Sequence, residues 1–222
     1  MNTADKTKIS TLINSWRPSD LVIIGGRPSM GKTSLMISAA ICCARDNSTP
    51  VAIFSLELSK IQLITKRILI QYGKNSMKLP IEIDDKPAID IEYFHSKVKE
   101  FTETSGIKVV FIDFLQLMQG DEVSKSLKLI AEELNITIVC FSQLPLSVED
   151  NEGNRPKLSD LGQRASGATE YADSILFIYR EAYYDDKTRN KTVELTVAKH
   201  HDDSLDCFEF RFEKSDGSIR NK

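Results

Sequence analysis

The sequence contains no apolar run that approaches the roughly 20 residues needed for a membrane-spanning helix. Its first ten residues are polar, carry lysines and include no apolar run, so we expect no signal peptide there. An excess of charge of one sign is also lacking, because 29 Lys and Arg face 32 Asp and Glu and the formal net charge is −3. This balance disfavours a globally basic protein that coats nucleic acid, although it allows a local basic strip.

Cysteine is scarce, and none of the four residues, Cys42, Cys43, Cys140 and Cys207, forms a CxxC pair. Three of them lie in apolar stretches, so we expect buried free thiols in a reducing cytoplasm, with a metal site as the alternative. The composition, with 41% hydrophobic and 27% charged residues, is that of an ordinary globular protein. A chain of 222 residues can bury a core as one domain without disulfide bonds or a structural metal.

Short, continuously apolar segments alternate with longer amphipathic ones along most of the chain. The apolar segments predict strands at 21–25, 51–55, 81–83, 109–113 and 136–141. The amphipathic segments predict helices at 32–44, 58–72, 89–104 and 122–134. Because continuous apolar strands are covered on both faces and the helices connect them, the pattern predicts an α/β fold. Its mainly parallel sheet should carry helices on both sides.

The pattern changes near the C-terminus. Three further strands are predicted at 174–180, 191–199 and 206–213, without room for long helices between them. The simplest interpretation is a strand meander added to the parallel sheet. The segment 145–167 is polar and has no structural signal, and a loop of this length inside a compact domain is usually functional or mobile.

A phosphate-binding motif follows the first predicted strand. Residues 26–33, GRPSMGKT, fit the pattern GxxxxGK[ST] and lie between a strand and a helix, as this motif requires. The glycines let backbone N–H groups surround phosphates, and the helix that follows points its positive end at the same charge. Lys32 would reach the β- and γ-phosphates of ATP, and the Thr33 hydroxyl would bind Mg²⁺. The predicted ATP-binding residues are Gly26, Arg27, Pro28, Ser29, Met30, Gly31, Lys32, Thr33 and Ser34.

Three polar residues end predicted strands at the edge where parallel sheets bind ligands. Asp113 is the candidate Mg²⁺ ligand, and a cap of the following turn is the alternative. Glu57 is the candidate base that activates the attacking water, and a helix N-terminal glutamate is the alternative. Gln143 could sense the γ-phosphate by hydrogen bonding, or it could simply be a satisfied polar residue at a strand end.

Five strings in the sequence resemble the ATPase domain of DnaB-type replicative helicases, a branch of the RecA-like P-loop NTPases. They are GGRPSMGKTS, FSLELS, VVFIDFLQLM, FSQL and ADSILFIYREAYY, in this order. The resemblance extends from about residue 21 to the C-terminus. It implies that Glu57 is the catalytic base, that Gln143 contacts the γ-phosphate and that Asp113 is the metal ligand. It further implies a homo-hexameric ring that pulls single-stranded DNA through its centre, driven by ATP hydrolysis between subunits.

The sequence also departs from this family. We expect no counterpart of the family's N-terminal helical domain, but a short lead at 1–20 and an ATPase domain at 21–222. The family's DNA-contacting loop corresponds to 160–173, which implies DNA contacts by Arg164 and Gly167. The family's KQR finger, which reaches the neighbouring subunit's γ-phosphate, appears as Lys199-His200-His201. Either Lys199 carries this interface alone or hydrolysis is slow, because histidine lacks arginine's permanent, fork-shaped charge. A plain surface turn at the two histidines is the alternative.

These features predict an ATP-dependent DNA helicase or single-stranded-DNA translocase that acts in DNA replication in the cytoplasm. The alternative is a RecA-like, ATP-binding accessory protein that does not unwind DNA. A small-molecule P-loop kinase is disfavoured, because there is no arginine-rich lid segment and because late strands are present. We expect an isolated chain that is mainly monomeric, with slow ATP hydrolysis.

Overall fold

The computed structural model describes residues 7–161, 167–185, 187–188, 190–201 and 206–222. The helices are α1 Ile9–Ile13, α2 Lys32–Asp46, α3 Lys60–Leu63, α4 Leu69–Tyr72, α5 Ile91–Ser105, α6 Val123–Leu134, α7 Ala168–Tyr171 and α8 Glu181–Tyr184. The strands are β1 Leu21–Gly26, β2 Val51–Ser55, β3 Ile81–Asp84, β4 Val109–Asp113, β5 Thr137–Gln143, β6 Ser174–Tyr179, β7 Thr192–Lys199, β8 Cys207–Glu213 and β9 Ser218–Asn221. A π-helical turn, η2 at Ile64–Ile68, joins α3 to α4, and five short 3₁₀ turns lie in the connections.

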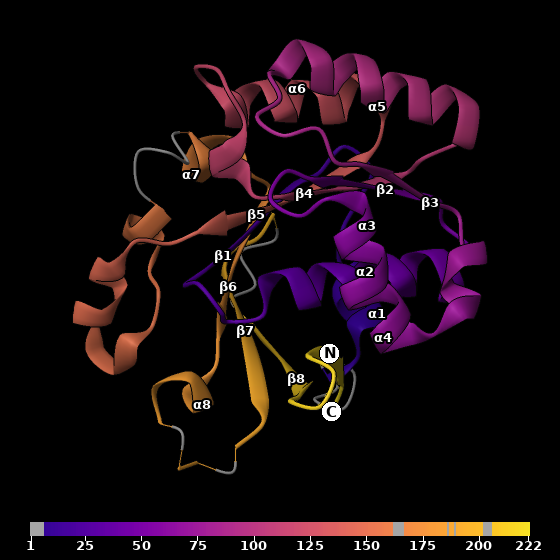
Figure 1. Cartoon of the computed structure of the whole chain (residues 1–222). Coiled ribbons are helices and arrows are strands. Elements are labelled where there is room, and N and C mark those ends of the chain that lie inside the picture. Colours follow the sequence, from indigo (N-terminus) through magenta and orange to yellow (C-terminus); the bar gives the residue numbers. More distant parts are fainter. Residues whose placement is uncertain (1–6, 162–166, 186, 189, 202–205) are drawn as a thin grey trace.

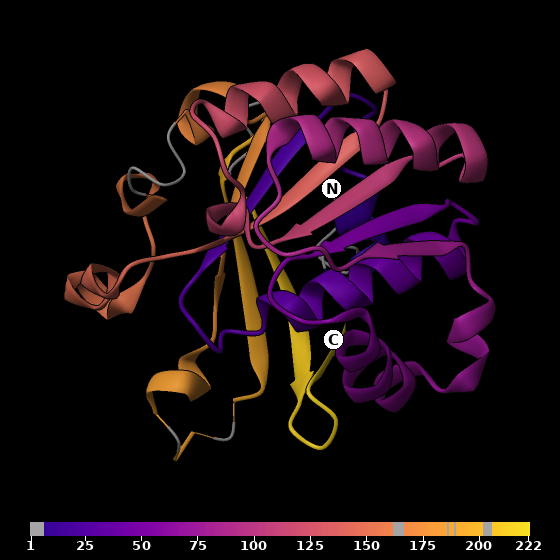
Figure 2. The same ribbon diagram turned by 45° about the horizontal axis from the view of Figure 1, so that its top comes forward.

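All nine of these strands form one sheet in the order β3-β2-β4-β5-β1-β6-β7-β8-β9. The strands from β3 to β6 run parallel, and the last three add an antiparallel meander to β6. The helices α5 and α6 cover one face and α1 and α2 cover the other (Figure 1). Figure 2 shows the strands fanning out beneath α5 and α6. The predicted α/β architecture, with its mainly parallel sheet, two helical layers and late meander, is confirmed.

The central strands are buried on both faces, as their continuous apolar sequences predict. In β1, Val22 and Ile24 pack into the core beneath α2, whereas Leu21 and Ile23 pack into the core beneath α6. Because β1, β2, β4 and β5 run parallel, their carboxyl ends meet at one edge of the sheet, which is where sheets of this kind bind ligands.

The prediction of one continuous helix at 58–72 is wrong, because the segment divides into α3, η2 and α4. It begins at a capping box in which the Ser59 hydroxyl accepts a hydrogen bond from the Gln62 N–H, and it widens into η2 after four residues. The wider turn puts Leu63 and Ile68, five residues apart and both buried, against the same core. The helix ends at Gly73, whose φ of 74° a residue with a side chain would rarely adopt.

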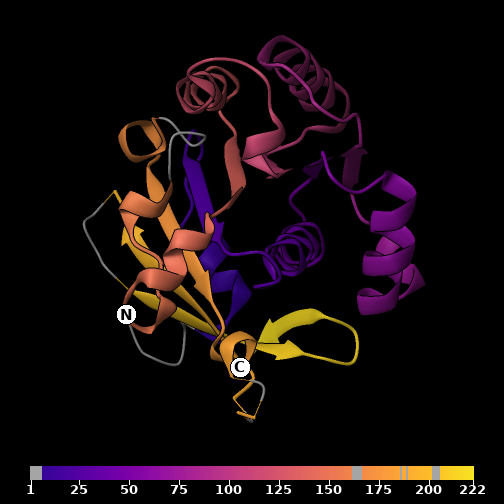
Figure 3. The same cartoon turned by 60° about the vertical axis from the view of Figure 1, so that its left-hand side comes forward.

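Three features have no counterpart in the sequence prediction. Helix α1 packs against α2 through Leu12, which is fully buried, so part of the expected lead contributes to the core. Strand β9 pairs with β8, and the tip of this hairpin accepts a hydrogen bond from Gln71 of α4 at the Asp216 carbonyl (3.3 Å; Figure 3). The segment after β5 contains 3₁₀ turns at Leu146–Asp150, Glu152–Asn154 and Leu158–Leu161.

The four cysteines are free thiols, as predicted, and three are buried, while Cys207 is partly exposed. Burial raises the pKa of Cys43 to about 12, so this thiol stays protonated and unreactive. Among the helices that the structure describes, none is both long and apolar enough to cross a membrane.

Candidate active site

The motif loop connects β1 to α2, and its glycines are required by space and by backbone geometry. A Cβ atom on Gly26 would lie 2.3 Å from Cγ2 of Ile178 in the neighbouring strand β6. Gly31, the residue before α2, has a φ of 102°, which residues with side chains rarely adopt. Met30 is buried in the core and anchors the loop from inside. The loop can therefore present its backbone N–H groups at the N-terminus of the 15-residue helix α2.

Lys32 is the buried cation of the loop, at 4% exposure. Its Nζ donates hydrogen bonds to the carbonyls of Gly26 (2.8 Å) and Arg27 (2.9 Å) and lies 5.1 Å from the centre of the Phe114 ring. Burial lowers the pKa of Lys32 to about 8, although the carboxylates of Asp113 and Glu57 favour its charged form. A nearby phosphate would add counter-charge that favours the ammonium form of Lys32 further.

Asp113 and Thr33 lie together at the ends of β4 and the loop. The Thr33 hydroxyl donates a hydrogen bond of 2.9 Å to Asp113 Oδ2. The other carboxylate oxygen, Oδ1, is buried without a hydrogen-bond partner among the described residues. Burial raises the pKa of Asp113 to about 7, against the lowering effects of the Thr33 hydrogen bond and of Lys32. A hydroxyl beside a buried carboxylate with a spare oxygen fits the oxygen donors that Mg²⁺ prefers.

A cavity of about 400 Å³ opens in front of the loop. It gathers six of the predicted ATP-binding residues together with Glu57 after β2 and Gln143 at the end of β5. Both of these side chains are exposed to solvent in the cavity. Residues far apart in the sequence thus face the same space, as expected from parallel strands that end at one edge. The loop residues in its wall are Pro28, Ser29, Gly31, Lys32, Thr33 and Ser34.

Arg27, which was predicted to bind ATP, is engaged elsewhere. Its Nη1 donates to the Leu144 carbonyl (3.0 Å), and its Nε and Nη2 donate to Oε1 of Glu149 (3.2 and 3.1 Å). Its side chain therefore fastens the motif loop to the segment that follows β5. The Arg27 backbone remains part of the loop.

The cavity wall contains four large side chains that sequence reasoning did not place there: Arg67, Phe114, Arg180 and Phe212. The guanidinium of Arg180 lies 3.7 Å from the centre of the Phe212 ring and donates to the Ser29 carbonyl (3.3 Å). The position of Arg180, directly after the strand that flanks β1, was a usable signal. The sequence contains no such signal for Arg67, because the π turn determines where its side chain points.

Lys199 and Gly167, two further predicted functional residues, are not among the residues that line this cavity. The Nζ of Lys199 donates to the carbonyls of Thr169 (3.0 Å) and Glu170 (3.4 Å) in α7. This lysine lines a separate cavity together with Lys125 and Lys128 of α6. Gly167 has a φ of 77° and immediately precedes α7, and Arg164 lies outside the described residues.

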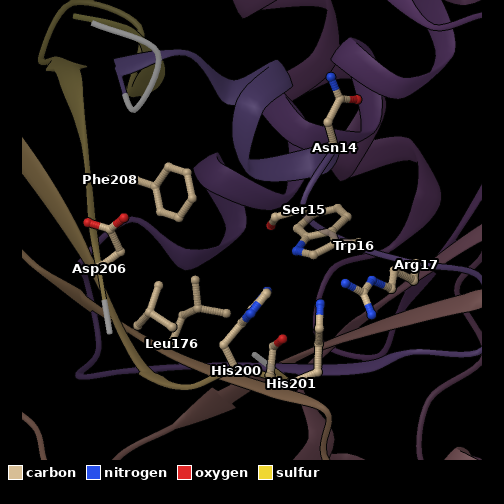
Figure 4. A pocket seen from close by; sticks show the side chains of 11 residues that line it. Asn14, Ser15, Trp16, Arg17, Leu176, His200, His201, Asp206 and Phe208 are labelled. Atoms are coloured by element: carbon tan, nitrogen blue, oxygen red, sulfur yellow. The ribbon is translucent and has the colours of Figure 1, made fainter. Parts of the chain in front are cut away.

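His200 and His201 lie in the wall of another cavity, of about 220 Å³, near the start of β6 (Figure 4). Their rings are 3.8 Å apart, and Figure 4 shows them on the opposite side of the cavity from Asn14. Trp16 and Phe208 form much of the apolar wall. Because β6 begins here and ends near the motif loop, the two histidines and the loop lie at opposite ends of this strand.

Comparisons with known proteins agree with the geometry. A family model described as the DnaB-like helicase C-terminal domain matches residues 3–78 and 66–221. The chain is 32% identical over 245 aligned positions to the replicative DNA helicase DnaB of Geobacillus stearothermophilus, covering 94% of this chain and 54% of that protein. It is 31% identical to the replicative DNA helicase DnaC of Bacillus subtilis (strain 168), with the same coverage. The chain thus spans about half the length of the curated relatives it matches.

Solved structures are also similar. The structure of another protein's ATPase domain matches with a TM-score of 0.87 and 28% identity, over 97% of this chain and 90% of that one. A DnaB-like replicative helicase, whose structure was described together with its interactions with primase, matches with a TM-score of 0.85 and 28% identity. This match covers 93% of this chain and 60% of that one. The resemblance inferred from the five sequence strings is confirmed.

Proposed function

Because this chain belongs to the family of DnaB-like helicase C-terminal domains, we propose that it is the ATP-hydrolysing motor of a replicative DNA helicase that moves along single-stranded DNA. One observation carries the proposal: the motif loop, Glu57 and Gln143 line the same cavity, and Thr33 in its wall is hydrogen-bonded to Asp113. Since the matched relatives are about twice as long, unwinding and the partners of the complete protein are part of the proposal.

The phosphates of ATP would lie against the loop and the N-terminus of α2. Backbone N–H groups and the helix dipole favour negative charge there, and Lys32 would exchange its two carbonyl contacts for phosphate oxygens. Thr33 and Asp113 would hold Mg²⁺, which neutralises charge on the phosphate oxygens when bound.

Glu57 and Gln143 would act on the γ-phosphate side of the cavity. Glu57 is exposed in the cavity, so its carboxylate can accept a proton from a water molecule and orient it for attack. Gln143 would donate a hydrogen bond from its amide to the γ-phosphate. It ends β5, directly before the segment that leads to the proposed DNA-contacting loop.

The stacked pair Arg180 and Phe212 would receive the nucleotide base. Both side chains line the cavity beside Ser29 and Gly31 of the loop. A guanidinium plane and an aromatic ring both stack well on a base. This arrangement would hold the base and the phosphates at two ends of one cavity.

Arg164 and Gly167 would contact DNA. The chains would assemble into a homo-hexamer in which Lys199 reaches the γ-phosphate bound by a neighbouring subunit. In the single chain, the Lys199 ammonium donates hydrogen bonds to carbonyls of α7, which lies within the segment 160–173 that we propose contacts DNA. The free, buried thiols support a reducing cytoplasm as the location.

The second candidate is an ATP-binding accessory protein that does not unwind DNA. His201 supports it, because this residue stands where the resemblance implies a finger arginine. Such a protein would bind ATP through the same loop, but DNA would not stimulate its turnover.

Release of inorganic phosphate from ATP with Mg²⁺, measured alongside binding of a fluorescent ATP analogue, tests the proposed reaction. Lys32→Ala should lose nucleotide affinity, because the phosphate charge is no longer balanced. Glu57→Gln should keep affinity and lose turnover by roughly a hundredfold or more, which is the usual contribution of a positioned base. Glu133→Gln, a change at an exposed glutamate of α6, is the matched control and should behave as wild type. Wild-type turnover in Glu57→Gln would show that the base lies elsewhere.

A further inference from the structure

Gln116 lies in the 3₁₀ turn Leu115–Leu117, directly after the strand that ends in Asp113. Its side chain reaches across to the end of the neighbouring strand β5. There the amide Oε1 accepts a hydrogen bond from the Gln143 N–H (3.0 Å), and Nε2 donates to the Gln143 carbonyl (3.2 Å). The same Nε2 donates to the hydroxyl of Ser142 (2.7 Å), which is fully buried.

On its other side, the main chain around Gln143 is held by the motif loop. The Leu144 N–H donates to the Gly26 carbonyl (3.1 Å), and Arg27 Nη1 donates to the Leu144 carbonyl (3.0 Å). The main chain around Gln143 is thus fastened on one side to the turn after β4 and on the other to the phosphate-binding loop. Its side chain is different, because no hydrogen bond among the described residues involves the Gln143 amide group, which faces the cavity.

We propose that Gln116 is a positioning residue for ATP hydrolysis: by clamping the main chain of Gln143 at both its N–H and its carbonyl, it aims the free Gln143 amide at the γ-phosphate. This inference rests on the proposed function of Gln143. A primary amide can make both contacts at once because it carries an acceptor and a donor on one plane. Gln116 also follows the Mg²⁺ ligand Asp113 by three residues, so it ties the metal side of the cavity to the γ-phosphate side.

Two substitutions remove the clamp in different ways. Gln116→Met keeps the length of the side chain and removes its hydrogen bonds. Gln116→Asn keeps the amide but is one methylene group shorter, so it cannot reach the next strand. Each should lower kcat by roughly ten- to a hundredfold, the size of effect expected when a reacting group is misplaced by about 1 Å, with KM for ATP unchanged. Gln119→Met, an exposed glutamine in the same connection, is the matched control and should have wild-type kcat.

A double-mutant cycle separates positioning from simple support of the fold. In a Gln143→Ala background, Gln116→Met and Gln116→Asn should cause no further loss of kcat, because the group that they misdirect is absent. Normal kcat in either Gln116 variant, with turnover lost in Gln143→Ala, would overturn this inference and leave the proposed function intact. An equal loss of kcat in both backgrounds would overturn it too, since Gln116 would then act on the fold. Full turnover in Gln143→Ala would reject the proposed role of Gln143 and the inference with it.

Discussion

At the scale of single residues, the site is defined by charges that the fold buries before any ligand arrives. Asp113 is 1% exposed and Lys32 is 4% exposed, and burial opposes the ionised form of each. Burying a charge without full compensation costs free energy, which a metal ion and a phosphate can return when they bind. Among the described residues, Oδ1 of Asp113 has no hydrogen-bond partner, which supports the proposed Mg²⁺ site.

The first prediction concerns Thr33, whose hydroxyl is both a hydrogen-bond donor to Asp113 and the proposed Mg²⁺ ligand. Thr33→Val keeps the shape of the side chain and removes that oxygen. We expect half-maximal phosphate release to require a higher Mg²⁺ concentration. The melting temperature should fall as well, because the substitution leaves the buried Asp113 carboxylate without its hydrogen bond from Thr33. Thr102→Val, which removes a hydroxyl that donates to the Val98 carbonyl in α5, should leave the Mg²⁺ dependence as in wild type. An unchanged Mg²⁺ dependence in Thr33→Val would exclude Thr33 as a ligand.

The second prediction concerns recognition of the base. Phe212→Ala and Arg180→Ala each remove half of the stacked pair, and a base stacked on such a group gains about 1–3 kcal/mol. We therefore expect ATP affinity to fall by roughly tenfold or more, measured by titration with a fluorescent ATP analogue. Binding of inorganic triphosphate, which has no base, should stay the same. Arg211→Ala, in the same strand as Phe212 but paired with Glu213, is the control. Equal losses for ATP and triphosphate would place the base elsewhere.

At the scale of secondary-structure elements, the π turn η2 is the feature that departs most from regular geometry. It lets Leu63 and Ile68, five residues apart, pack on one core, although in an α-helix they would be roughly 140° apart. Turns of this kind occur mostly as single insertions and are frequent at functional sites. Here the turn also carries Arg67, whose side chain lines the nucleotide cavity.

The third prediction follows from this spacing. Deleting Thr65 would place Leu63 and Ile68 four residues apart, on one face of a regular α-helix, so the protein should remain folded with a similar melting temperature. Arg67 directly precedes the anchored Ile68, and ATP binding should therefore persist. Deleting Lys97 from α5 is the matched control, because it rotates Phe94 roughly 100° away from Val98 and Phe101 and should lower the melting temperature markedly. Unfolding of the Thr65 deletion would show that the wider turn itself is needed.

The elements also show what the sequence could predict and what it could not. The strands β2 and β4 were predicted to the residue, because a continuously apolar run between polar segments has one simple explanation. Strand β9 was missed, since Arg220 and Asn221 give it an exposed, polar half. The break in the helix 58–72 was missed because one inserted residue barely changes an apolar periodicity.

The residues of the site also include some that the sequence could predict and some that it could not. Local patterns identified the loop residues, and the rule that parallel strands end at one edge brought Glu57, Asp113 and Gln143 to the same place. Arg67 and Phe212 come from segments whose position depends on tertiary packing, so no local pattern could assign them to the cavity. Lys199 lies outside the cavity of its own chain, and its proposed target is in a neighbouring subunit.

At the scale of the whole molecule, the proposed motor joins three surfaces along the sheet. The nucleotide cavity lies at the carboxyl ends of the parallel strands, and α7 lies within the proposed DNA-contacting segment 160–173. Lys199 at the end of β7 is hydrogen-bonded to α7. If Lys199 completes a neighbour's active site, Lys199→Ala should lower turnover without changing ATP affinity. His201→Arg should raise turnover, because it adds a permanent fork-shaped charge. Unchanged rates in both variants would contradict a shared site.

The most direct test of the central claim is the rate of phosphate release per chain, measured over a range of protein concentrations with and without oligo-dT. An ATP-driven motor on single-stranded DNA predicts a rate that rises with protein concentration, rises further with oligo-dT and disappears in Glu57→Gln. The stimulation by oligo-dT should weaken as salt is raised, because contacts to the DNA backbone release counterions. A rate that is the same at every concentration and does not respond to oligo-dT would contradict the motor and favour the ATP-binding accessory protein.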